Sequence, residues 1–304
     1  MAEFSASQAA FEGFRLARER PGAILIWAAL LFVLNLAATA LLVGLAGEEL
    51  TRLSEIQASD EVDPLMGFRL LGRVAPAYLV ALAVSLVAYA VLYAGVHRAA
   101  MRPEEGGPGF LKLGADERRV GAALLLVFLI LVGAYVVTLL GAGILVGLAS
   151  LLGGPVATLV TVLAIVAVIG GLLWLSVRLS LAVPTTFARR RMQVRAAWAL
   201  TRGRFWLLFG AYLLAVLLAI VVTLLALVVF TALAVLLGGG FEAAGRLLNP
   251  DLSSLESYLT PTALLSAGFS AVVGALGTAI TVGVTSDAYK QITRGDKASV
   301  MPAA

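Results

Sequence analysis

Residues 178–210 read RLSLAVPTTFARRRMQVRAAWALTRGRFWLLFG, a basic segment that lies between two long apolar stretches. Pro184 suits the first turn of a helix, where its missing N–H is not needed, so the segment predicts a helix that begins near this residue. Phe187, Val194 and Trp198 recur along it at helical spacing and share one face, while arginines cover the flanks. This pattern is typical of an amphipathic helix that lies in a membrane interface.

The arginines of this segment are the candidate lipid contacts. Their aliphatic stems can lie along the acyl region while the guanidinium groups reach lipid phosphates, at roughly 1 kcal/mol per basic residue near an anionic surface. No acidic residue lies between Arg178 and Glu242 to neutralise them. We predict headgroup contacts from Arg189, Arg190, Arg191 and Arg195, and interfacial anchoring by Phe187, Val194 and Trp198. The alternative, that these arginines only fix the topology of the chain, stays open because basic cytoplasmic loops are common.

The composition places the whole chain in a membrane. Of its 304 residues, 61% are hydrophobic and 13% are charged, whereas about 25% of the residues in a soluble domain are charged. Six apolar stretches are each long enough to cross a bilayer at about 1.5 Å per residue. We predict an all-α polytopic membrane protein, a single integral membrane domain over residues 1–304, with spans near 22–46, 74–96, 120–152, 156–183, 205–237 and 262–286.

The spans are predicted to pair. Gly153, Gly154 and Pro155 alone separate the third span from the fourth, so these two form a tight hairpin. A short basic segment with an aromatic residue, Phe14, Phe110 or Trp198, precedes each of three span pairs. We therefore predict three hairpins, each preceded by a short amphipathic interfacial helix, and interpret them as tandem units in one orientation.

Small residues at a spacing of four predict where helices pack closely. They allow the backbones of neighbouring helices to approach each other inside a membrane. The predicted packing residues are Gly143 and Gly147 in the third span, and Ser266, Ser270, Gly274 and Thr278 in the sixth.

Polar side chains within the spans are interpreted as contacts between helices. Ser85, Tyr89 and Tyr93 form part of a polar stripe on the second span, which is typical of interhelical hydrogen bonds. Arg178 and Asp287 each lie near one end of a span, where an unpaired charge is costly, so we predict an ion pair between them. Lys290, three residues after Asp287, offers this carboxylate an alternative partner.

The distribution of basic residues predicts the orientation of the chain. Segments 1–21, 97–119, 178–204 and 287–304 hold 3, 5, 7 and 3 Lys or Arg residues, which is 18 of the 22 in the chain. The connections on the other side hold the remaining four. Cytoplasmic loops carry the excess of Lys and Arg, so we predict a multi-pass protein with both termini in the cytoplasm.

The residue inventory excludes several classes of function. The chain has no Cys and one His, so it offers no thiol nucleophile, no thiolate metal site and no His-rich metal site. We expect no metal, no cofactor and no catalytic residues, since no catalytic motif is present. The net charge of +4 resides in loops and favours an anionic membrane surface over nucleic acid as partner.

Two segments resemble a known family. They are GVHRAAMRPEEGGPGFLKL at residues 95–113 and RLSLAVPTTFARRRMQVRAAWALTRGRFW at residues 178–206. Both are similar to segments of bacterial six-helix membrane proteins of the glycerophosphoryl diester phosphodiesterase membrane-domain family and its uncharacterised relatives. In that family an Arg precedes a Pro near the end of the fourth span and a basic helix follows. Arg178, Pro184 and residues 196–206 match this pattern, with Ala197 where Ser is usual.

The resemblance implies a fold and a location in the bacterial cytoplasmic (inner) membrane, and no activity. The family's membrane domain is not itself the phosphodiesterase, and this chain leaves no room for the soluble catalytic barrel. The residues favour a non-catalytic protein that binds or moves anionic phospholipid at the cytoplasmic leaflet. A structural or regulatory partner of other membrane proteins is the alternative, and a membrane-embedded lipid-modifying enzyme is a remote one.

Overall fold

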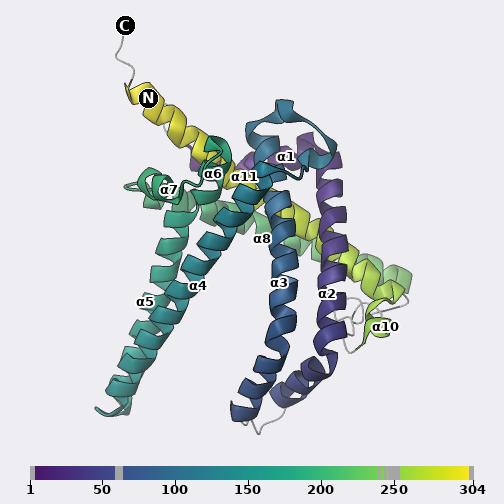
Figure 1. The fold of residues 1–304 in the computed structure, drawn as a ribbon, viewed down its shortest axis with the longest axis vertical. Helices are drawn as coiled ribbons and strands as arrows, with labels where there is room; N and C mark the ends of the chain where they lie inside the picture. Colours follow the sequence, from purple (N-terminus) through teal and green to yellow (C-terminus); the bar gives the residue numbers. More distant parts are fainter. Residues whose placement is uncertain are drawn as a thin grey trace.

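The computed structural model describes residues 4–58, 64–238 and 254–300, together with positions 240, 242 and 245. Every regular element in these ranges is helical (Figure 1). The elements are α1 (Ala6–Glu19), α2 (Pro21–Ala58), α3 (Pro64–Met101), η1 (Pro103–Glu105), η2 (Pro108–Phe110), α4 (Ala115–Ser150), α5 (Gly154–Leu179), α6 (Ala182–Arg189), α7 (Val194–Leu200), α8 (Phe205–Gly238), α10 (Leu255–Tyr258) and α11 (Pro261–Val300).

Six helical segments in this part of the chain are long and apolar enough to cross a membrane. They are Pro21–Arg52, Arg69–Met101, Ala115–Ser150, Gly154–Arg189, Phe205–Leu236 and Pro261–Gly295. The predicted all-α class and the six spans are therefore confirmed.

The helix ends follow local sequence signals. Ser5 caps α1, because its side chain accepts a hydrogen bond from the Gln8 N–H. Gly153, at φ 111°, makes the turn between α4 and α5, a backbone conformation that glycine adopts without a steric penalty. Helix α2 continues beyond the predicted end of its span but kinks there, at Ala46 (φ −149°, ψ 21°).

Helix α11 is at the centre of the packing and contacts α1, α2, α3 and α8. Ala271, Ala275 and Ala279 are at most 1% exposed and form one core cluster with Leu31 of α2. Ser270, from the predicted packing series, is exposed instead. Two members of the predicted series do pack, because a Cβ atom on Gly274 would lie 3.4 Å from Leu31 and Thr278 is buried. Close packing therefore involves the alanine series, which is offset by one residue, together with Gly274 and Thr278.

Helix α1 crosses α11 with its backbone in direct contact. A Cβ atom on Gly13 would lie 2.3 Å from the Cα of Ile280, and one on Gly283 would lie 2.8 Å from the Cα of Gly13. Beside this crossing, the Lys290 ammonium lies 3.0 Å from the carboxylate of Glu12. Glycine at both positions lets the two helices approach closely enough for this ion pair to form.

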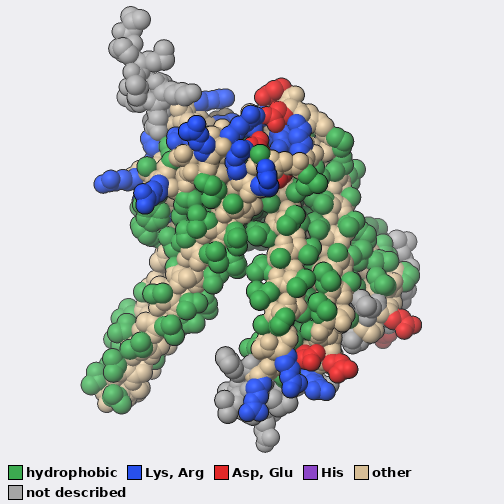
Figure 2. Space-filling model, in the orientation of Figure 1, with side chains coloured by type: hydrophobic (Ala, Val, Ile, Leu, Met, Phe, Trp, Pro, Cys, Tyr) green, Lys and Arg blue, Asp and Glu red, His purple; other side chains and the backbone are tan. Residues whose placement is uncertain are grey.

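Helices α4 and α5 pack along each other and form an arm that projects away from the other helices (Figure 1). Most of its surface consists of apolar side chains (Figure 2), as expected for helices that face lipid. A Cβ atom on Gly143 or Gly147 would meet nothing within 4 Å. The predicted close packing at these two glycines is therefore absent from the described part of the structure, because α5 packs on another face of α4 and leaves the glycine face open.

Lys and Arg side chains gather over the end of the molecule that carries α1, α6 and α7 (Figures 1 and 2). A smaller group of both signs lies at the opposite end of α2 and α3. The fold thus brings basic segments that are far apart in the sequence to one end, which we call the basic end. Its cytoplasmic location stays a prediction.

Cysteine labelling tests this orientation, because the natural chain has no Cys. Ser254 lies before α10 and Ser299 near the end of α11. We expect a membrane-impermeant maleimide to label the Ser254→Cys variant in intact cells and the Ser299→Cys variant only after permeabilisation. The reverse pattern would overturn the predicted topology.

Candidate functional site

The basic segment of residues 182–200 folds as two helices rather than one. Helix α6 ends where Arg190 adopts a left-handed conformation (φ 52°, ψ 30°), and α7 begins four residues later at Val194. The Gln193 N–H donates to the Thr186 hydroxyl at 3.3 Å and holds the turn. The prediction of one continuous helix is wrong, and Phe187 and Trp198 consequently do not share a face.

Phe187 belongs to the protein interior and not to the membrane interface. Its side chain is 1% exposed and stacks on the His97 ring, with 5.6 Å between ring centroids. The Arg102 guanidinium lies 4.4 Å from the centre of the Phe187 ring. Its predicted role as an interfacial anchor is therefore wrong, because this ring attaches α6 to α3. Val194 and Trp198 are partly buried against neighbouring helices.

Three of the four predicted headgroup residues are available to a ligand. Arg189, Arg191 and Arg195 are exposed and form no ion pair within the part of the chain that the structure describes. We call these three residues the arginine surface. Arg190 differs, because it donates to the Glu105 carboxylate at 3.2 Å.

A buried ionic network, which the sequence did not predict, includes Glu105, the partner of Arg190. Arg98 is 1% exposed, and its guanidinium donates to the Glu117 carboxylate, to the Phe110 carbonyl and, at 3.2 Å, to Glu105. Glu105 also accepts from Arg102. Partial burial opposes ionisation of Glu105, but the two neighbouring arginines outweigh it and hold the pKa of this carboxyl below its usual range.

The network fixes the connection between α3 and α4. The Trp27 indole N–H of α2 donates to the Gly109 carbonyl at 2.6 Å, and the Arg20 guanidinium lies 4.6 Å from the centre of the Phe110 ring. The connection consists of the two 3₁₀ turns η1 and η2. The predicted separate amphipathic helix beginning at Phe110 is thus absent from this described segment, whose backbone is held by side chains of α2 and α3.

The predicted ion pair between Arg178 and Asp287 is not present. Asp287 lies 3.2 Å from the Lys290 ammonium and accepts from the Gln291 amide at 2.6 Å. The Arg178 guanidinium lies instead 4.4 Å from the centre of the Trp198 ring. The local partner at i+3 is favoured because it lies on the same face of α11.

Polar residues on α3 and α11 line a cavity of about 580 Å³ between α3, α4, α8 and α11. Thr278 and Thr281 donate to carbonyls of their own helix. The Tyr89 and Tyr93 hydroxyls form no hydrogen bond with any described residue. The stripe predicted to form interhelical hydrogen bonds therefore lines a cavity.

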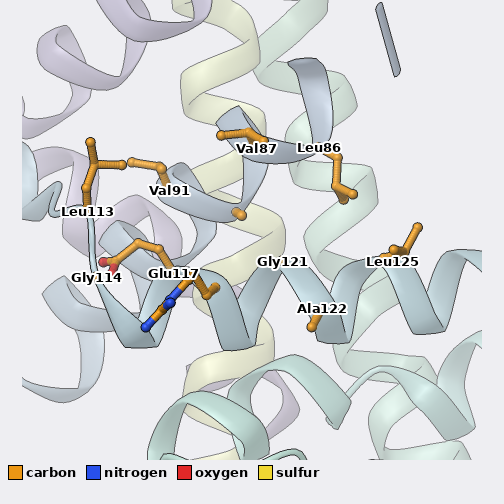
Figure 3. Close-up of a pocket in the computed structure, with 11 residues that line it drawn as sticks. Leu86, Val87, Val91, Leu113, Gly114, Glu117, Gly121, Ala122 and Leu125 are labelled. Atoms are coloured by element: carbon orange, nitrogen blue, oxygen red, sulfur yellow. The ribbon is translucent and has the colours of Figure 1, made fainter. Parts of the chain in front are cut away.

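A groove of about 580 Å³ lies between α3 and the beginning of α4 (Figure 3). Val87 and Val91 line it from α3 and Leu125 from α4, so most of its wall is apolar. Glu117 and Arg118 contribute its polar part. Glu117 lies near the end where Leu113 and Gly114 lie (Figure 3). The groove thus joins an apolar wall to the charged connection at the basic end.

No family model, curated protein or solved structure matches the chain. The resemblance to the phosphodiesterase membrane-domain family therefore stays a prediction. Support for a function therefore comes from the arginine surface and from the groove between α3 and α4.

Proposed function

We propose that this protein binds anionic phospholipid at its basic end without catalysing a reaction. The observation that carries the proposal is the arginine surface. Arg189, Arg191 and Arg195 are exposed beside helices long enough to span a membrane, and no described carboxylate neutralises them. Lipid phosphates are the anions present where the ends of spanning helices meet the bilayer surface.

Physical chemistry favours several weak lipid contacts over one strong contact at this surface. Each exposed basic residue near an anionic leaflet contributes roughly 1 kcal/mol, and the attraction extends over a Debye length of about 8 Å at physiological salt. Binding to the arginine surface should therefore weaken as salt is added. Arg190 should contribute less, because Glu105 already neutralises it.

The groove between α3 and α4 gives such a lipid a place for an acyl chain. Its apolar wall includes Val87, Val91 and Leu125. Arg118, also in its lining, is exposed and forms no ion pair with a described residue. A chain along this wall would place its phosphate near the Arg118 guanidinium, at the basic end.

A triple substitution tests the proposal. Arg189→Gln, Arg191→Gln and Arg195→Gln together should reduce the phosphatidylglycerol that copurifies with the protein by several-fold, because each weak lipid contact loses roughly 1 kcal/mol of attraction, which is about fivefold in binding. The bound lipid is counted by mass spectrometry after extraction in a mild detergent.

The matched control removes three arginines from the opposite end, with Arg52→Gln, Arg69→Gln and Arg73→Gln. This control should retain phosphatidylglycerol at the level of the natural chain. Equal retention by the two triple variants would contradict the proposal, because the arginine surface would then be no different from any other three positive charges.

The alternative function, a structural partner of other membrane proteins, is favoured by a separate observation. Gly143 and Gly147 have the spacing of a close helix contact, yet their surroundings within the described chain are open. A helix of another protein could pack there. Gly143→Leu with Gly147→Leu would then remove a copurifying protein while leaving the bound lipid unchanged.

A further inference from the structure

Arg178, in the last turn of α5, is a buried cation without a hydrogen-bond partner. The residue is 7% exposed, and its Nε atom is buried and unpaired. Neither of its Nη atoms forms a hydrogen bond, and no carboxylate pairs with it, within the part of the chain that the structure describes. All five N–H donors of this guanidinium therefore lack an acceptor within the described part of the chain.

The surroundings of Arg178 compensate this charge only in part. Its guanidinium lies 4.4 Å from the centre of the Trp198 ring and 5.9 Å from that of Trp174. Aromatic faces attract a cation, but an N–H directed at a ring forms a weaker interaction than a hydrogen bond to an oxygen. Arg202 is close enough for its positive charge to act on Arg178, so the neighbouring charge adds repulsion.

The backbone of Arg178 and the two rings beside its guanidinium are held by neighbouring groups. The Thr201 hydroxyl is buried and donates to the Arg178 carbonyl at 3.1 Å, which attaches the end of α7 to α5. The Trp174 and Trp198 rings meet edge to face, with 5.5 Å between centroids. A buried guanidinium on a rigid frame is a preorganised site for an anion.

We propose that Arg178 forms a phosphate subsite between α5 and α7 that holds the headgroup phosphate of one anionic phospholipid. The planar guanidinium matches two phosphate oxygens, which can accept from its N–H groups in a bidentate arrangement. This inference rests on the proposed function and adds to it one specific, saturable site, distinct from the diffuse attraction of the arginine surface.

The position of the subsite favours a lipid over a soluble phosphate as its source. Trp174 is 47% exposed on a helix with an apolar surface, and tryptophan is typical of the level where headgroups meet acyl chains. A lipid whose phosphate lies at Arg178 would place its glycerol region beside this ring. Free phosphate would have only the guanidinium contacts.

The test compares the number of tightly bound lipids in three forms of the protein. Phosphatidylglycerol is added in equimolar amount to protein in a neutral detergent, and native mass spectrometry counts the lipids retained at high salt. We expect the natural chain to retain one lipid. Arg178→Gln should lower that occupancy by at least about tenfold, because hydrogen bonds to a charged group are lost. The triple variant of the arginine surface should retain it.

The possible outcomes separate this inference from the proposed function. If Arg178→Gln retains the lipid as the natural chain does, the subsite is refuted, whatever the arginine surface does. The triple variant could instead show no loss of lipid at low salt while Arg178→Gln loses the tightly bound lipid. Lipid binding by the arginine surface would then be refuted and the subsite at Arg178 would be supported.

A second measurement covers the case in which Arg178→Gln does not fold. The melting temperature of the natural chain should rise with phosphatidylglycerol and not with phosphatidylcholine, since a ligand of the native state stabilises it. Arg178→Lys, which keeps the charge but loses the planar fork, should show a smaller rise. An equal rise with millimolar sodium phosphate alone would overturn the assignment to a lipid, and an equal rise in the Lys variant would overturn the role of the guanidinium.

Discussion

Replacing Gly13 by alanine is expected to separate α1 from α11 and to destabilise the protein by roughly 3 kcal/mol, the upper end of the usual cost of overpacking. The added Cβ would lie 2.3 Å from the Cα of Ile280 and 2.5 Å from the Ala279 carbonyl oxygen. Both are backbone atoms, so no side-chain rotation can relieve the contact. Gly283→Ala meets the same crossing from the other side and should have a similar effect.

Thermal unfolding in a mild detergent measures this cost. Gly143→Ala is the matched control, because it is a helical glycine whose added Cβ would meet nothing within 4 Å. The control should be neutral or more stable by about 0.5–1 kcal/mol, since alanine is the better helix former. If Gly13→Ala unfolds at the temperature of this control, the backbone contact between α1 and α11 is not part of the native fold.

Replacing Arg98 by glutamine is expected to cost about 3–5 kcal/mol, because it leaves the buried carboxylate of Glu117 without its charged partner. The Arg98 and Glu117 side chains are 2% and 6% exposed. The Phe110 carbonyl would also lose its donor, so the connection between α3 and α4 should loosen. Limited proteolysis within residues 102–114 should then become faster, together with a lower melting temperature.

An exposed pair in the same region provides the control. Arg119 lies 2.9 Å from Asp116 with its side chain 37% exposed, and such pairs contribute at most about 1 kcal/mol. Asp116 would also keep its contact with Arg102. Equal melting temperatures for Arg98→Gln and Arg119→Gln would show that the buried network does not stabilise the fold.

The architecture could be predicted from the sequence wherever the signal is local. The length of the apolar stretches is enough to predict six spans. The Gly-Gly-Pro sequence at 153–155 marks the turn after α4, and Ser5 marks the start of α1. The break at Arg190 could not be predicted, because a left-handed arginine in the middle of a basic run carries no turn signal.

The sequence predicted what type of residue packs between helices, but not which individual residues meet. Two series of small residues in α11 share the spacing of four and differ by one residue, and the sequence did not show which members of each series face α2. The alanine series, extended to Gly283, was a signal available in the sequence. Arg98 and Glu117 lie at the ends of different helices, and charges alone did not show that these two would meet.

Some features of the candidate site could be predicted from the sequence, and others depend on tertiary contacts. Exposure of the arginine surface follows from its many charges, which the sequence displays. The burial of Phe187 depends on His97 and Arg102, and the isolation of Arg178 depends on Asp287 bonding to Lys290. These are tertiary choices between partners, and a single sequence does not reveal them.

The most direct test of the account is the lipid selectivity of the unmodified chain. The protein is reconstituted in membranes with equal parts phosphatidylglycerol and phosphatidylcholine, extracted with its nearest lipids, and the retained ratio is measured at low and high salt. We predict enrichment of phosphatidylglycerol over the membrane ratio, with a smaller enrichment at high salt. A retained ratio equal to that of the membrane at both salt concentrations would contradict the proposal that the basic end binds anionic phospholipid.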